Sequence, residues 1–202
     1  MNARATYVLK FLFPQLIWEI KTDNKEIFLT FDDGPHPEIT ARVLDILDDY
    51  QAKASFFCVG HNVEKFPETY KEIITRGHQT ANHSFNHLNG WKTPRQVYYD
   101  NIEKCATLVD SKLFRPPYGR ISLKQVANLK QKYSIVMWSV LSVDFSKKIT
   151  PEQCFHNSIK YTKTGSIVVF HDSEKAAENL LYALPRFLDH FKKLGYNFVV
   201  IN

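Results

Sequence analysis

The chain has 202 residues, of which 44% are hydrophobic and 14% aromatic, and its formal net charge is +5. This length and composition are typical of one globular domain that buries roughly 70% of its unfolded surface. The positive charge is compatible with an anionic partner such as a cell-wall polymer. The basic residues form no concentrated patch, however, so we expect no nucleic-acid partner.

The cysteines and the N-terminal stretch indicate the cellular compartment of the protein. The three cysteines stand singly and far apart, at Cys58, Cys105 and Cys154. This spacing indicates reduced thiols rather than a disulfide framework. The apolar stretch 7–18 is interrupted by Lys10 and Pro14, so we expect neither a membrane span nor a secretory signal there. We expect a short amphipathic segment that docks on the domain, in a protein that is cytoplasmic by default, with an extracytoplasmic or membrane-peripheral location left open.

Strand and helix patterns alternate along the chain. Short apolar runs predict strands at 27–31, 54–59, 79–82, 113–115, 134–138, 166–170 and 197–201. Apolar residues at helical spacing predict helices at 37–50, 63–76, 94–109, 122–132, 151–160 and 176–193. These β-α units indicate a parallel sheet with its functional residues at the carboxyl ends of the strands. Periodicity alone leaves open whether the sheet forms a barrel or an open doubly wound sheet.

Two adjacent carboxylates, Asp32 and Asp33, come directly after the first predicted strand and are followed by Gly34-Pro35. Successive strand residues point to opposite faces, so the two can serve different tasks. The same residues are also good turn formers, which is the alternative interpretation.

The segment 82–87 contains His83 and His87, which share one face if it forms a helical turn. Together with Asp33 they offer two nitrogens and one oxygen. This is the ligand set of a catalytic zinc-type site, and also that of the non-haem iron(II) oxygenases.

Two later clusters also follow predicted strands. Arg115 precedes Pro116-Pro117 and could orient a carboxylate, and His171 is suited to donate a proton. The alternatives are an ordinary surface ion pair for Arg115 and a core imidazole for His171.

Taken in order, the motifs T-F-D-D-G-P, H-S-x-x-H, R-P-P-Y-G and apolar-H-D are similar to those of the polysaccharide deacetylases of the NodB-homology type, carbohydrate esterase family 4. The resemblance implies an α/β fold, an incomplete (β/α)7 barrel, as a single domain at 26–202 after an N-terminal extension at 1–25. It implies that a divalent cation, Zn²⁺ first and Co²⁺ or another ion as alternatives, is bound by Asp33, His83 and His87.

The resemblance also implies the catalytic roles. Asp32 would be the base, Arg115 would hold it, the backbone N–H of Tyr118 would bind the oxyanion, and His171 would be the acid. The family usually has Asp-x-x-Asp-Trp after its fifth strand. Here Leu141 stands in place of the first Asp and Phe145 in place of the Trp, while Asp144 is retained and is expected to tune the late histidine. Substrate contacts are expected from Pro117, Tyr118, Phe145 and Val169.

The implied activity is metal-dependent removal of acetyl groups from N-acetylated sugars, of the N-acetylglucosamine type, with release of acetate. The alternatives are an O-acetyl xylan-type esterase and a catalytically impaired glycan-binding protein. An iron(II) oxygenase is disfavoured because those enzymes usually have antiparallel scaffolds. Which glycan is the substrate, and the oligomeric state, do not follow from the sequence.

Overall fold

Eight parallel strands form one curved sheet in the computed structural model, which describes residues 10–11 and 13–202. The strands are β1 (Glu26–Asp32), β2 (Ser55–Cys58), β3 (Gln79–Asn82), β4 (Leu113–Phe114), β5 (Ser134–Ile135), β6 (Val140–Leu141), β7 (Ile167–His171) and β8 (Asn197–Phe198). Their order is β5-β4-β3-β2-β1-β7-β6, and β8 pairs with the beginning of β1.

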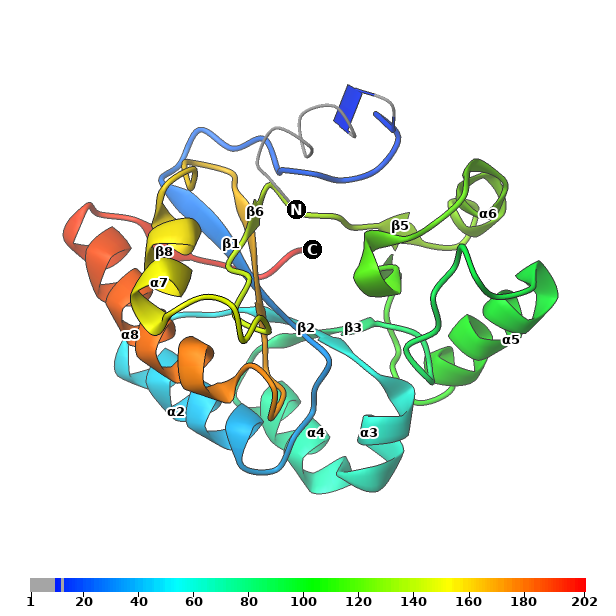
Figure 1. Ribbon diagram of the computed structural model, residues 1–202, viewed down its shortest axis with the longest axis horizontal. Coiled ribbons are helices and arrows are strands. Elements are labelled where there is room, and N and C mark those ends of the chain that lie inside the picture. Colours follow the sequence, from blue (N-terminus) through cyan, green and yellow to red (C-terminus); the bar gives the residue numbers. More distant parts are fainter. Residues whose placement is uncertain (1–9, 12) are drawn as a thin grey trace.

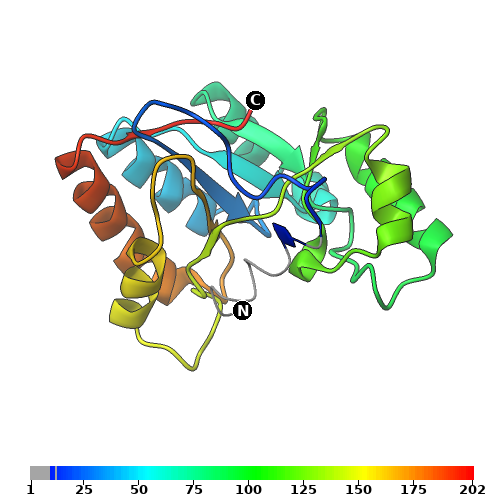
Figure 2. The ribbon, with the colours of Figure 1, turned by 90° about the horizontal axis from the view of Figure 1, so that it is seen from above.

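The helices cover the outside of this sheet (Figures 1 and 2). They are α2 (Ile39–Asp49), α3 (Gly60–Lys65), α4 (Pro67–Thr75), α5 (Arg95–Ala106), α6 (Leu123–Leu129), α7 (Pro151–Ile159) and α8 (Ala177–Lys193). None of the helices in the described part of the chain has the length and apolar character needed to cross a bilayer.

The sheet is an incomplete barrel because its two edges lie close together. Residues 136–139 alone connect β5 to β6, and extended chain spans at most about 3.4 Å per residue. Both ends of this link stay bonded to the sheet, since Val136 N–H donates to the Phe114 carbonyl at 2.9 Å and Ser139 N–H to that of Ile167 at 3.0 Å. The expected incomplete (β/α)7 barrel is confirmed.

The N-terminal segment crosses the open side of the barrel, at the top of Figure 1. Ile17 pairs with Val136 beyond β5, and Glu19 pairs with Ser166 before β7, so residues 17–19 connect the β5 edge to the beginning of β7. The neighbouring Leu16 and Trp18 are 6% and 4% exposed. Of the expected docking segment 7–18, residues 7–9 and 12 lie outside the described residues, and residues 16–18 pack on the barrel.

Alternation along β1 determines which of its side chains point into the barrel. Ile27, Leu29 and Phe31 belong to the core between the sheet and the helices. Phe28 belongs to the second core, inside the barrel, and Asp32 lies on the same face of the strand because side chains alternate. The period-two pattern therefore directs Asp32 into the barrel.

Three predicted elements differ clearly from the structure. The predicted strand 197–201 ends at Phe198, as β8. The predicted helix 63–76 is two helices, α3 and α4, because Phe66 has φ −129° and ψ 59° before Pro67, and proline disfavours helical geometry in the residue before it. The predicted strand 134–138 ends at Ile135, and the following β6 was not predicted. The Val136 and Met137 carbonyls accept hydrogen bonds from the Arg115 side chain, which ends the regular ladder.

Candidate active site

A cavity of about 320 Å³ opens at the carboxyl ends of the strands. Its lining includes most of the side chains that the sequence singled out, namely Asp32, Asp33, His83, His87, Tyr118, Phe145, Val169 and His171, and also Leu141. Arg115 and Asp144 lie behind this wall, fully buried. Pro117 is buried and does not line the cavity, whereas its neighbour Pro116 does.

Three further residues of the lining, Arg120, Trp138 and Lys175, were not expected at the site. Trp138 ends the predicted strand 134–138, so the rule that sites lie at strand ends could have found it. Arg120 and Lys175 are in loops, and no pattern in the sequence distinguishes them from other surface cations.

Arg115 fixes the position of Asp32 through a buried ion pair. One guanidinium nitrogen, Nη1, donates to Asp32 Oδ1 at 2.6 Å and to the Thr30 hydroxyl at 2.8 Å. The guanidinium also stacks on Phe57, 3.9 Å from the ring centroid. Burial lowers the pKa of Arg115, and the Asp32 carboxylate opposes this effect. A buried charge with this many partners is rigid, so Asp32 is held in one orientation.

Asp33, His83 and His87 converge on one point. Asp33 Oδ1 is 3.1 Å from His87 Nε2 and 3.7 Å from His83 Nε2, and one ligand atom from each residue lies within 4.8 Å of the others. Asp33 itself has φ 80°, and the Asn62 amide donates to its carbonyl at 2.7 Å, which fixes the turn after β1.

The protonation states of Asp33 and His83 suit a metal ion. His83 Nδ1 lies 2.8 Å from the Arg115 carbonyl, which can only accept, so Nδ1 carries the proton and Nε2 has its lone pair free. Burial lowers the pKa of His83 to about 4, which keeps this imidazole neutral. Burial raises the pKa of Asp33, but a hydrogen bond from His87 and the charges of nearby histidines lower it more, to well below its usual range. The Asp33 carboxylate and the free lone pair of His83 Nε2 fit a zinc-type ion.

The histidine loop has a different backbone from the helical turn considered above. Ser84 and His87 have φ of 61° and 54°, which is left-handed, and no helix spans this segment. The Asn101 side chain on α5 holds the loop by accepting from the backbone N–H groups of Phe85 and Asn86, at 3.0 and 2.9 Å. The two imidazoles therefore converge through a strained loop.

His171 and Asp144 form a second charged pair, in which Asp144 is fully buried and His171 is partly exposed to the cavity. His171 Nδ1 donates to Asp144 Oδ1 at 2.7 Å, and the His171 backbone N–H donates to Oδ2 at 2.7 Å. Burial alone would lower the pKa of His171, but the Asp144 carboxylate outweighs it and the pKa is raised to about 9. The imidazole is thus protonated at neutral pH. Phe145 packs against this ring edge-on, with centroids 4.9 Å apart.

Tyr118 lies in a strained turn beside His87. Its φ is 61° within the short 3₁₀ turn η1 (Pro117–Gly119), and its ring centroid is 4.5 Å from that of His87. The preceding prolines restrict the backbone, so the left-handed conformation is held in place.

Asp172, the last residue of the apolar-H-D motif, is buried behind the cavity and was given no role from the sequence. Its carboxylate accepts from the Gly34 N–H at 3.1 Å and bonds the Thr40 hydroxyl at 2.5 Å. A Cβ on Gly34 would lie 2.0 Å from Asp172 Oδ2, so only glycine fits there. Burial raises the pKa of Asp172 to about 8. The residue fastens the turn that carries Asp33 to the end of β7.

A parallel barrel that brings a paired carboxylate, a protonated imidazole and an N,N,O ligand trio to one cavity is the arrangement of a metal-assisted hydrolase. A family model described as polysaccharide deacetylase matches residues 19–137. The chain therefore belongs to the polysaccharide deacetylase family, carbohydrate esterase family 4.

Individual relatives agree with this assignment. A peptidoglycan-N-acetylglucosamine deacetylase of Bacillus cereus is 34% identical over 195 residues, which cover 92% of this chain and 90% of that protein. A chitooligosaccharide deacetylase of Azorhizobium caulinodans is 32% identical over 162 residues, 76% of each chain. The crystal structure of the Bc1960 peptidoglycan N-acetylglucosamine deacetylase, in complex with 4-naphthalen-1-yl-N-oxidanyl-benzamide, superposes with a TM-score of 0.87 at 31% identity, over 95% of this chain and 94% of that one.

Proposed function

We propose that this polysaccharide deacetylase hydrolyses the N-acetyl group of N-acetylglucosamine-type residues in a glycan and releases acetate. The observation that carries the proposal is that two oppositely charged catalytic groups, the Asp32 carboxylate and the His171 imidazolium, face the same cavity as the trio Asp33, His83 and His87. A carboxylate can take a proton while the imidazolium gives one, which is what amide hydrolysis requires.

Each protein group has one task in this mechanism. Asp33, His83 and His87 would hold a divalent ion, which would supply Lewis acidity to the acetyl carbonyl and to the attacking water. Asp32, which Arg115 holds in place, accepts a proton from the water while the water oxygen bonds to the acetyl carbon. The Tyr118 N–H donates to the oxyanion. His171 then gives a proton to the amine nitrogen as the C–N bond breaks, leaving acetate and a free amino sugar.

The alternatives are weaker for physical reasons. Cleaving an O-acetyl ester needs less help from an acid, because an alkoxide leaves more readily than an amide anion, whereas this site holds a His171 with its pKa raised to about 9. A glycan-binding protein without activity would not need the Arg115–Asp32 and Asp144–His171 pairs. The N,N,O donor set favours zinc as the ion, and the peptidoglycan named for the relatives favours an extracytoplasmic site of action.

The test uses the chelated protein reloaded with zinc or cobalt and incubated with N-acetylglucosamine oligomers, with acetate measured as the product. Acetate should appear only after reloading. His83→Ala and His87→Ala should lose the ion by elemental analysis and lose activity, while His156→Ala, an exposed histidine on α7, should change neither. Unchanged metal content in the first two variants would refute the ligand assignment, and acetate without any divalent ion would refute the mechanism.

A further inference from the structure

Two cations without a charged partner stand on the wall of the active cavity, Arg120 and Lys175. Among the residues that the structure describes, neither side chain makes an ion pair or a hydrogen bond. Each lies instead against an aromatic ring: Arg120 Cζ is 5.3 Å from the Trp91 ring centroid, and Lys175 Nζ is 5.6 Å from that of Phe145. Trp91 is 64% exposed, so this first pair is open to a large ligand.

The other charges of the cavity are already matched. Asp32 is paired with Arg115, and Asp144 with His171. Asp33 is the carboxylate of the proposed metal site, where a divalent ion more than offsets its charge. Arg120 and Lys175 are therefore the charged residues of the cavity wall that no protein group neutralises. A ligand in this cavity experiences a positive electrostatic potential from them.

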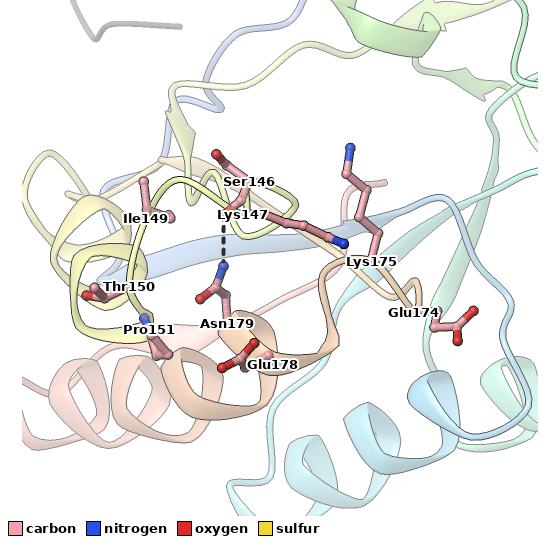
Figure 3. A pocket seen from close by; sticks show the side chains of 9 residues that line it. All are labelled: Ser146, Lys147, Ile149, Thr150, Pro151, Glu174, Lys175, Glu178 and Asn179. Carbon is pink, nitrogen blue, oxygen red and sulfur yellow. Dashed lines mark hydrogen bonds between the residues drawn. The ribbon is translucent and has the colours of Figure 1, made fainter.

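Lys175 also lines a neighbouring hollow of about 810 Å³, formed by the loops after β6 and β7. Figure 3 shows that the Lys175 side chain projects away from Glu174 and Glu178, the acidic residues of this hollow, so these carboxylates do not cancel its charge toward the active cavity. Lys147 adds a further cation to the same hollow. There is thus room beside the reacting sugar, on the Lys175 side, for the next unit of a polymer.

We propose that Arg120 and Lys175 bind carboxylates carried by the units that flank the N-acetyl sugar, so that the enzyme selects an acidic glycan over a neutral one. The proposal rests on the proposed function, whose site it deepens. An aromatic face next to a cation suits a sugar that bears an acid, because the ring packs on the apolar face of the sugar and the cation pairs with its carboxylate. Arginine and lysine at these positions thus determine specificity rather than catalyse the reaction.

Binding tests the proposal independently of turnover. Calorimetry would use metal-loaded protein carrying Asp32→Asn, which prevents hydrolysis. The ligands are a neutral N-acetylglucosamine tetramer, an alternating N-acetylglucosamine and N-acetylmuramic acid tetramer without peptide, and the same acidic tetramer with its peptides. Arg120→Ala and Lys175→Ala should each weaken binding of the acidic ligand about two- to fivefold, the usual effect of an exposed ion pair, and leave the neutral ligand unchanged. Lys148→Ala, in the same loop as Lys147 but outside both cavities, is the matched control.

The outcomes separate the two proposals. A preference for the peptide-free acidic tetramer assigns the carboxylate to the sugar, a preference confined to the peptide-bearing one assigns it to the peptide, and both support the inference. Equal binding of neutral and acidic ligands, or equal losses for both in the variants, would overturn it even if acetate is released normally. Conversely, the Asp32→Asn protein could prefer acidic ligands while the wild-type enzyme releases no acetate from any of them. That result would refute the proposed function and leave the inference standing.

Discussion

Replacing Asp144 with Asn should shift the alkaline limb of the pH–rate profile to lower pH. Burial by itself lowers the pKa of His171, and the Asp144 carboxylate reverses this and raises it to about 9. Without that charge the pKa should fall to the ordinary 6.5 or below. At pH 8 the protonated fraction of His171 would then drop from about nine-tenths to about 3%, a loss of about 30-fold in kcat/KM.

The His171–Asp144 pair should also make the free energy of unfolding depend on pH. Because the pKa of His171 is higher in the folded protein than its ordinary 6.5, its contribution is fully present below pH 6.5 and is lost as the pH rises through about 9. A shift from 6.5 to about 9 corresponds to about 3 kcal/mol of unfolding free energy. Urea denaturation of the metal-free protein at pH 6 and pH 9.5 should show a loss of stability that is about 3 kcal/mol larger in the wild type than in Asp144→Asn, because the other buried groups, Asp172 among them, titrate in both proteins.

The substitution also disturbs hydrogen bonds, which the assay must separate from charge. Asp144 accepts from the His171 ring through one oxygen and from the His171 backbone through the other. An Asn amide places an NH₂ group against one of these donors, so some stability should be lost at every pH. An alkaline limb that stays in place, with activity lowered equally at all pH values, would mean that Asp144 only shapes the loop and would refute the electrostatic argument.

Three further predictions concern the turn after β1. Asp32→Asn should keep the metal and lower turnover by roughly 10²–10⁴, the usual contribution of a positioned base, whereas Asp33→Asn should weaken metal binding itself; identical metal titrations of the two variants would contradict this division of tasks. Gly34→Ala should destabilise the protein by more than about 3 kcal/mol in urea denaturation, because its Cβ would lie 2.0 Å from Asp172 Oδ2. Asp172→Ala should cost about 2–4 kcal/mol by leaving the Gly34 N–H without its partner, and a change below about 1 kcal/mol would show that the turn does not depend on this carboxylate.

The sequence was informative where a residue's role depends on local pattern. The alternation of β1 directs Asp32 into the barrel. The ends of the predicted strands place Asp33, Arg115 and His171 together at the carboxyl end of the sheet. The assignment of roles to these residues came from the order of motifs and stays a prediction until the variants are measured.

Other features depend on contacts between distant segments and could not be predicted. The end of β5 is set by Arg115, which takes the carbonyls of Val136 and Met137 away from the ladder. The histidine loop depends on Asn101, a polar residue of α5 that looks like any other residue of an exposed helix face. The domain boundary between residues 25 and 26 was predicted from where the motifs begin. We propose that the domain begins before Leu16, because Leu16 and Trp18 belong to the core inside the barrel.

The position of the N-terminal segment also affects the order in which the protein can fold during synthesis. Ile17 pairs with Val136, and Glu19 with Ser166, so these early residues have partners roughly 120 and 150 residues later in the chain. Contacts of such long range form late, because the intervening chain must first be made and ordered. Residues 17–19 can therefore take their final places on the barrel only after the chain has been synthesised as far as Ser166.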